Sequence, residues 1–279
     1  ALSRIDTTNM IEDVPQSKID NNINFRSLII NGDMSQSQRG TSQASAGSTN
    51  GSYDTIDRFA FARDNLGAFT QSQSTDVPTG QGFANSMKFD CTTADASPSA
   101  GDYAFAVQYV EAQNCQYLKF GTSNATSLTL SFWVKSNKTG IYCADIRSLD
   151  SARLISKTYT ISSADTWEKK TITYDGDTVG TINNDNGIGL QCSFWLGAGS
   201  NFTSGTLQTS WNTYTAANRA VGQVNLADST ANEWLITGVQ LEANTVASSF
   251  NFEPYDVNLM RCARYCHAAM DYGAGNTGS

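Results

Sequence analysis

The chain has 279 residues, of which 16% are charged, and its formal net charge is −8. Because the 18 Lys and Arg residues are scattered and outnumbered by 26 Asp and Glu residues, no basic stripe is available to bind nucleic-acid phosphates. No apolar run approaches the roughly 20 residues that a membrane span needs, so we expect neither nucleic-acid binding nor membrane insertion.

An extended arm is predicted for residues 1–24, where isolated apolar residues are mixed with Asp and Asn and Pro15 interrupts the pattern. No period of two or 3.6 residues is sustained, so this stretch cannot bury its own apolar surface and we expect a partner to order it. The pattern changes at Phe25. Residues 27–30 are typical of a short buried strand that ends in the turn signal of residues 31–33.

A series of short strands then follows at the spacing that is typical of an all-β sandwich or barrel. Within each strand, larger apolar side chains alternate with small or polar ones at a period of two residues. Long polar connections are predicted at residues 36–52 and 197–222, and a shorter loop at residues 181–187. The predicted strands are residues 53–63, 83–89, 103–109, 128–135, 140–147, 153–161, 167–174, 190–196 and 233–242.

Two of these strands carry a tryptophan on the side that is otherwise polar. In residues 128–135, Trp133 shares its side with Thr, Ser and Lys, and in residues 190–196, Trp195 shares its side with Gln and Ser. Burial of an indole stabilises a fold by roughly 3 kcal/mol, so a tryptophan on a polar side needs an explanation. Either a second layer covers that side or a flat ligand, such as a sugar ring, stacks on it.

The C-terminal part changes to helical spacing. After an extended stretch, the apolar side chains from Leu259 to Cys266 recur at intervals of three and four residues, which predicts a helix over residues 257–270. The chain therefore divides into an attachment arm (1–24), a β domain (25–256) and a C-terminal helix with a flexible tail (257–279).

The six cysteines show neither a CxxC pair nor zinc-finger spacing. Because the N-terminus lacks the charged-then-apolar layout of a secretory signal, we expect buried free thiols rather than a disulfide framework. Cys262, Cys266 and His267 form the one cluster with metal-ligand character, since a helix places the two sulfurs one turn apart. His267 is the sole histidine, so a helix that packs its cysteines is the favoured interpretation.

Six segments, in order, resemble a family of tailed-bacteriophage virion proteins. They are SLIINGDMSQSQRGTS, YDTIDRFAF, LTLSFWVKS, ADTWEKKTITYDGDTVGTINNDNGIGLQCSFWLGAGS, GQVNLADST and WLITGVQLEANTVASSFNFEPYDVNLMRCARYC. The resemblance covers roughly residues 25–267, and the ordered set is specific although no single segment is. The family comprises tail fibres and other virion appendages with a carbohydrate-binding-module-like jelly roll. It implies an all-β, two-sheet antiparallel jelly-roll sandwich with an extended N-terminal arm and a short C-terminal helix.

Glycan binding is the function that this resemblance implies. Sugar rings present a C–H face that packs on aromatic planes, while amide and charged side chains hydrogen-bond to the hydroxyl groups. We expect a shallow platform formed by Trp133, Trp195, Trp167, Gln191 and Lys135. The alternative is that a loop such as residues 197–222, or another subunit, covers the tryptophans.

A structural calcium ion is a second hypothesis from the resemblance. Similar jelly rolls hold calcium near the first and last strands with carboxylate and carbonyl oxygens, and Asp33 and Glu242 stand at the matching positions. The match is partial, because an acidic residue is common in those modules where this chain has Thr237 or Gly238. The alternative is that Asp33 and Glu242 only shape turns.

No catalytic constellation stands out, and we expect a protein that is not an enzyme. A serine or cysteine nucleophile needs a base, and the sole histidine lies near the C-terminus. A glycosidase needs two carboxylates at a set separation, which a sequence with 26 acidic residues does not reveal.

These observations predict a phage virion structural protein, a fibre or appendage subunit, that binds host-surface glycans for attachment. Its arm would contact other virion proteins, and the protein would assemble in the host cytoplasm and reside in the virion. By analogy with phage fibres we expect a homotrimer, in which several weak glycan sites combine into a useful avidity. The alternative is a purely architectural capsid or tail decoration protein whose aromatic residues form subunit interfaces.

Overall fold

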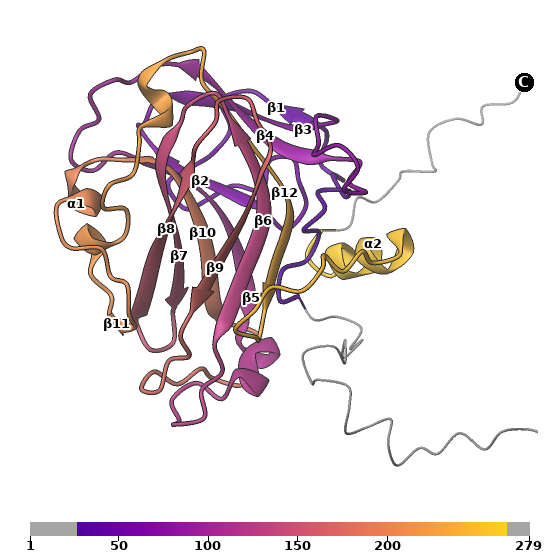
Figure 1. The fold of residues 1–279 in the computed structure, drawn as a ribbon, viewed down its shortest axis with the longest axis vertical. Coiled ribbons are helices and arrows are strands. Elements are labelled where there is room, and N and C mark those ends of the chain that lie inside the picture. Colours follow the sequence, from indigo (N-terminus) through magenta and orange to yellow (C-terminus); the bar gives the residue numbers. More distant parts are fainter. Residues whose placement is uncertain (1–26, 267–279) are drawn as a thin grey trace, which may run out of the picture.

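The computed structural model describes residues 27–266, which form two six-stranded antiparallel sheets packed face to face (Figure 1). Sheet A has the strand order β1-β3-β4-β12-β6-β9, and sheet B has the order β11-β8-β7-β10-β5-β2. The predicted two-sheet jelly-roll sandwich is confirmed. The strands of sheet A are Ser42–Gln43 (β1), Ala68–Ser74 (β3), Ser86–Thr93 (β4), Leu128–Ser136 (β6), Glu168–Tyr174 (β9) and Glu233–Glu242 (β12). Those of sheet B are Ala60–Asp64 (β2), Tyr103–Glu111 (β5), Gly140–Ser148 (β7), Arg153–Ile161 (β8), Ile188–Ala198 (β10) and Asn212–Thr213 (β11).

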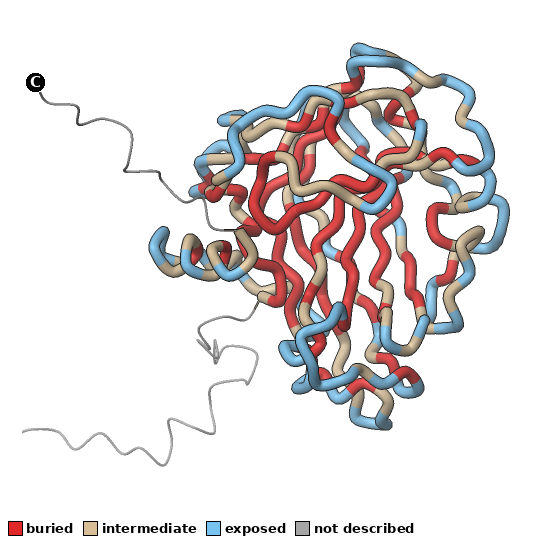
Figure 2. Tube along the Cα trace, turned by 180° about the vertical axis from the view of Figure 1, so that it is seen from behind, coloured by how far each residue is buried: buried red, intermediate tan, exposed pale blue. Residues whose placement is uncertain are grey.

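The main core lies between the two sheets, and Figure 2 shows buried residues along the central strands with exposed residues in the connections. Phe132 of β6 meets Phe194 of β10 with ring centroids 5.2 Å apart. Phe61 of β2 meets Phe89 of β4 with centroids 4.4 Å apart. Each pair joins opposite sheets, so these aromatic contacts form only when both sheets are in place.

The two tryptophan-bearing strands face each other across this core and do not lie side by side. β6 belongs to sheet A and β10 to sheet B, and their apolar sides meet at Phe132 and Phe194. The other side of each strand therefore points to a different outer surface of the sandwich. The prediction of a single platform that contains both Trp133 and Trp195 is wrong for this reason.

Strand β12 contains a β-bulge, and because of it the apolar side chains of both halves of the strand face the main core. Its pairing with β6 shifts between Thr237 and Gln240, and apolar side chains on both sides of the shift, from Trp234 to Leu241, reach the core. Gly238 lies in the shift with φ of +63°, and a Cβ at this position would lie 2.5 Å from a phenylalanine ring. Any other residue at position 238 would therefore be strained.

Strand β3 is absent from the predicted strands because two of its inward positions are polar, so its sequence does not show the alternation of apolar and polar residues. Phe69 is followed on the same side by Gln71 and Gln73. The Gln71 amide donates to Met87 Sδ at 3.2 Å, and the Gln73 amide donates to the Met34 carbonyl oxygen at 2.7 Å. Hydrogen bonds thus replace the apolar contacts that would have identified the strand from the sequence.

Several predicted boundaries also differ. Residues 27–30 form bends, with one β-bridge between Ser27 and Glu242 in place of the predicted strand. The strand predicted at residues 53–63 is confined to β2, because residues 53–58 form turns and irregular backbone. The strand predicted at residues 83–89 begins later, at Ser86.

The C-terminal helix α2, Tyr255–Ala263, lies beside the sandwich and is shorter than predicted (Figure 1). It is not long or apolar enough to cross a membrane, and neither is any other helix in the described residues. The predicted arm at residues 1–24, His267 and the predicted tail lie outside the described residues.

The cysteines are free thiols, as expected, and five of the six are buried. Cys143 and Cys192 lie on central strands of sheet B. Burial, with a smaller contribution from a nearby carboxylate, raises the pKa of Cys143 to about 12, so this thiol stays protonated at neutral pH. These two cysteines therefore act as small apolar side chains.

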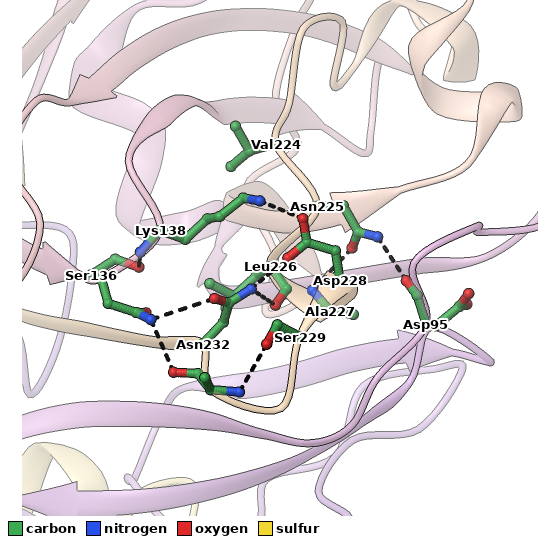
Figure 3. A network of polar contacts seen from close by, with 12 residues as sticks. Asp95, Ser136, Lys138, Val224, Asn225, Leu226, Ala227, Asp228, Ser229 and Asn232 are labelled. Atoms are coloured by element: carbon green, nitrogen blue, oxygen red, sulfur yellow. Dashed lines mark hydrogen bonds and ion pairs between the residues drawn. The ribbon is translucent and has the colours of Figure 1, made fainter.

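The connection between β10 and β12 covers part of the outer side of sheet B, and a polar network fixes its C-terminal end (Figure 3). Asn225 Nδ2 donates to the Asp95 carbonyl oxygen at 2.7 Å, and the Lys138 ammonium group pairs with Asp228. Asn232 Nδ2 donates to Asp228 Oδ1 at 2.6 Å. These contacts bind the connection to the β4–β5 loop and to the β6–β7 turn.

The short helices in residues 27–266 are η1 (Ala112–Leu118), α1 (Ser200–Thr203), η2 (Ala216–Asn218) and η3 (Leu226–Asp228).

Candidate functional site

Trp195 lies on the outer side of sheet B but is fully buried. The β10–β12 connection covers it with Phe202, whose ring centroid is 5.5 Å away, and with Arg219, whose guanidinium carbon is 4.6 Å from the indole centroid. Phe105 of the neighbouring β5 packs at 4.8 Å. The predicted role of Trp195 in an exposed stacking platform is therefore wrong, and the alternative of a covering loop is confirmed.

A buried ion pair holds this cover on the sheet. Arg219 Nε donates to Asp145 Oδ2 at 2.7 Å, and Trp195 Nε1 donates to the same oxygen at 2.9 Å. The Arg219 side chain is 4% exposed and that of Asp145 is 0% exposed. Burial alone would lower the pKa of Arg219, but the Asp145 carboxylate outweighs it and the pKa is raised, so the guanidinium remains charged.

Three of the predicted site residues meet on the outer side of sheet A. Trp133 and Lys135 lie on β6, and Trp167 lies at the end of the β8–β9 connection. Asp76, from the β3–β4 connection, pairs with the Lys135 ammonium group and accepts a hydrogen bond from Trp167 Nε1 at 2.9 Å. We call Trp133, Lys135, Trp167 and Asp76 the Trp133 surface.

The polar groups of the Trp133 surface satisfy one another. Partial burial would raise the pKa of Asp76, but the hydrogen bonds from Lys135 and Trp167 outweigh this effect and lower it. The carboxylate is therefore ionised at neutral pH and compensates the charge of Lys135. A ligand would gain a stacking contact on the half-buried Trp133, but it would have to compete with these internal contacts for the polar groups.

A second group of side chains lies on the outer side of sheet B, beside the covered area. The strand register places Gln191 of β10 between Tyr109 of β5 and Arg147 of β7. Since neighbouring strands are about 4.8 Å apart, the backbones at Tyr109 and Arg147 are about 10 Å apart. Tyr53 packs on the apolar cluster of this face, and the Tyr214 ring lies over Arg147 at 4.1 Å. We call Tyr53, Tyr109, Arg147, Gln191 and Tyr214 the Tyr109 platform.

The platform combines partly exposed tyrosine rings with a partly exposed guanidinium group, above the buried amide of Gln191. Burial raises the pKa of both Tyr109 and Tyr53, while nearby guanidinium groups oppose the rise. Both hydroxyls therefore stay protonated at neutral pH, where they donate and accept hydrogen bonds. Gln191 Nε2 donates to Ser193 Oγ at 2.9 Å, which orients the amide. This set of groups matches the chemistry of a sugar, which has an apolar ring face and a rim of hydroxyls.

Sequence reasoning selected Gln191 but missed the tyrosines and Arg147. On β5 the larger side chains, including Phe105 and Tyr109, point outward, whereas the smaller Ala104 and Ala106 face the main core. Alternation alone assigns the larger side of a strand to the core. The available signal is that both sides of β5 are apolar, which indicates a strand that is covered on its outer side as well.

The two predicted calcium ligands have different hydrogen-bond partners. Asp33 Oδ1 accepts hydrogen bonds from Ser35 Oγ at 3.1 Å and from Asn258 Nδ2 at 3.2 Å. Glu242 has both oxygens bound to Ser248, at 2.7 Å from its backbone nitrogen and 2.9 Å from its hydroxyl. No group of three His, Cys, Asp or Glu residues within the described part of the chain is arranged to hold a metal ion. These two carboxylates do not fit a calcium site, and their contacts match the alternative of turn residues.

We therefore expect that calcium does not stabilise the protein. Binding to the native state alone raises the melting temperature in proportion to the logarithm of ligand concentration. Melting curves recorded in millimolar calcium and in chelator should superimpose. A calcium-dependent rise that Asp33→Asn removes would restore the calcium hypothesis.

Comparison with known proteins yields structural likenesses only. No family model and no curated protein matches the chain. The enzymatically active domain of tailspike protein 4 from bacteriophage CBA120 is similar over 71% of this chain and 21% of its own, with 16% identity and a TM-score of 0.38. This chain therefore spans about a fifth of that domain.

Two carbohydrate-binding modules are similar at comparable levels. The family 11 module from Clostridium thermocellum, in complex with a β-1,3-1,4-mixed-linked tetrasaccharide, matches 74% of this chain and 98% of its own, with 12% identity and a TM-score of 0.35. The CBM22-2 xylan-binding domain of Paenibacillus barcinonensis Xyn10C matches 71% and 98%, with 14% identity and a TM-score of 0.35. These values are too low to assign a function to the chain.

Proposed function

We propose that the chain is a glycan-binding module of a phage virion appendage, and that it holds its glycan on the Tyr109 platform without cleaving it. The observation that carries the proposal is the row of Tyr109, Gln191 and Arg147 on three adjacent strands, with Tyr53 and Tyr214 beside it. Tyrosine rings stack on the C–H face of a sugar, and the amide and guanidinium groups bind its hydroxyls.

The Trp133 surface is the less favoured position for the same function. Its lysine and its Trp167 indole nitrogen are already bound to Asp76, so a ligand has to compete with these contacts. On the Tyr109 platform, the Gln191 side chain is buried with its amide nitrogen bound to Ser193, and Tyr214 hydrogen-bonds to Arg219, but the Arg147 guanidinium group makes no hydrogen bond and no ion pair. A charged donor is therefore free to meet a glycan on the Tyr109 platform, whereas the lysine of the Trp133 surface is already paired.

The assignment to a virion appendage rests on the six sequence segments that resemble phage appendage proteins. In this proposal the ligand is a host-surface polysaccharide, and residues 1–24 attach the module to other virion proteins. Assembly into a homotrimer would place several platforms on one particle component. Multivalent contact then converts a weak single-site affinity into a useful avidity.

Replacement of Tyr109 by alanine tests the position of the glycan site. Because the variant removes a stacking ring from the centre of the platform, we expect glycan affinity to fall about tenfold or more, with little change in melting temperature. Binding is measured by depletion of the labelled protein onto a panel of purified bacterial surface polysaccharides, and folding by circular dichroism.

Two variants serve as controls for this test. Tyr255→Ala removes a 67% exposed tyrosine from α2 and should bind as the wild type does. Trp133→Ala changes the opposite face and should also retain binding. Retained binding by Tyr109→Ala together with loss by Trp133→Ala would move the site to the Trp133 surface. Absence of any wild-type binding across the panel would overturn glycan binding and favour a purely architectural protein.

A further inference from the structure

Arg147 is the one arginine in residues 27–266 whose guanidinium group makes no hydrogen bond and no ion pair. Its Nε is buried without a partner. The Nε of Arg58 is also buried without a partner, but Arg58 donates through Nη2. Polar groups of native proteins are almost always paired, so a guanidinium group with no hydrogen bond at all, at a candidate binding site, points to a missing ligand. The other arginines in this part of the chain each donate to a carboxylate or a carbonyl oxygen: Arg39, Arg58, Arg63, Arg153, Arg219, Arg261 and Arg264.

The acidic residues around the platform are already engaged. Asp145, two positions before Arg147 on the same side of β7, binds Arg219 with both oxygens, at 2.7 and 3.3 Å. Glu111, two positions after Tyr109 on β5, binds the Arg264 guanidinium at 3.0 Å. Neither carboxylate is thus free to neutralise Arg147.

The guanidinium group is also held in place for a ligand. The Tyr214 ring lies over it at 4.1 Å, and the Tyr214 backbone nitrogen donates to the Ala152 carbonyl oxygen at 2.8 Å. A guanidinium that stacks on an aromatic ring keeps its N–H edge available for hydrogen bonds. Arg147 therefore needs little reorganisation to bind an anion.

We propose that the ligand of the Tyr109 platform is an acidic glycan, in which a carboxylate or another oxyanion on the sugar pairs with Arg147 while a sugar ring stacks on Tyr109. This inference rests on the proposed function. The planar fork of arginine matches the two oxygens of a carboxylate, which favours a charged group over a neutral hydroxyl at this position. The whole chain carries a net charge of −8, so its overall field repels acidic ligands and the selection has to be local.

The test compares polysaccharides that differ only in charge. Each acidic polysaccharide of the panel is used in its native form, after chemical reduction of its carboxyl groups, and after removal of any sulfate groups. We expect wild-type protein to bind a native form about tenfold more tightly than the same polymer without its anionic groups. The two treatments distinguish a carboxylate ligand from a sulfate ligand.

Arg147→Gln should bind the native and the neutralised polymer equally, at the level of wild-type protein on the neutralised one. Lys169→Gln is the matched control, since it makes the same change in net charge at an exposed position on β9 of sheet A, and it should keep the wild-type preference. Arg147→Lys should keep part of the preference, because it retains the charge but loses the fork.

The outcomes separate the two proposals. Equal wild-type binding to native and neutralised polymers would overturn the acidic-glycan inference and leave glycan binding intact. An equal loss of preference in Lys169→Gln and Arg147→Gln would also overturn it, because the effect would then come from net charge. Binding to neither form would overturn the proposed function itself. Circular dichroism checks that Arg147→Gln folds, as expected for a residue whose guanidinium group makes no hydrogen bond and no ion pair.

Discussion

Replacement of Asp145 by alanine is expected to lower the free energy of unfolding by about 3–5 kcal/mol. The variant leaves the Arg219 charge buried without a counter-charge and removes the acceptor of Trp195 Nε1, which lie 2.7 and 2.9 Å from the carboxylate. Removal of one partner from a buried ion pair costs far more than removal of a surface pair, because the remaining charge is desolvated. Urea unfolding followed by circular dichroism measures the loss.

Two comparisons make this result specific to the buried pair. Glu111→Ala removes an ion pair whose Arg264 side chain is 56% exposed, and it should cost much less than Asp145→Ala because water screens this pair. A double variant, Asp145→Leu with Arg219→Met, should recover much of the stability, because it leaves no buried charge. A loss below about 1 kcal/mol in Asp145→Ala would contradict the conclusion that this pair holds the β10–β12 connection on sheet B.

The fold class can be predicted from the sequence because the residues that form the main core are apolar at every second position of most strands. The inward side of β6, from Leu128 to Val134, is apolar at every position, and this pattern alone identifies a strand with one buried side. The pattern failed where a hydrogen bond took the place of an apolar contact, as at Gln71 and Gln73 on β3. A donor and its acceptor can be far apart in the sequence, so the alternation of apolar and polar residues does not reveal that a polar side chain is hydrogen-bonded inside the protein.

The candidate site was harder to predict because its position depends on which sheet each strand joins. Trp133 and Trp195 have the same alternation context, yet one lies half-buried on sheet A and the other is fully buried under a connection on sheet B. Local periodicity gives the side of a strand on which a residue lies, but not what covers that side. Tyr214 lies in the β10–β12 connection, 19 residues after Trp195 in the sequence. It reaches the platform only through tertiary packing over Arg147.

Replacement of Trp195 by alanine is therefore expected to destabilise the protein by about 3–5 kcal/mol, whereas Trp133→Ala should cost much less. Trp195 packs on Phe105 and Phe202, with ring centroids at 4.8 and 5.5 Å, and its removal leaves a large cavity beneath the connection. Trp133 is partly exposed, so its site relaxes into solvent when the ring is removed. Urea unfolding of the two variants measures the difference.

The same pair of variants decides what covers Trp195. A cover supplied by the chain's own connection protects this indole at every protein concentration, so quenching of tryptophan fluorescence by acrylamide should be the same in dilute and concentrated wild-type protein. Trp195 and Trp234 are both fully buried, so a decrease, not a complete loss, of the least quenched component in Trp195→Ala, with no decrease in Trp133→Ala, would match the buried position. A quenching curve that changes with concentration and follows Trp195 would instead mean that subunit contact shields it, as an architectural role of the aromatic residues requires.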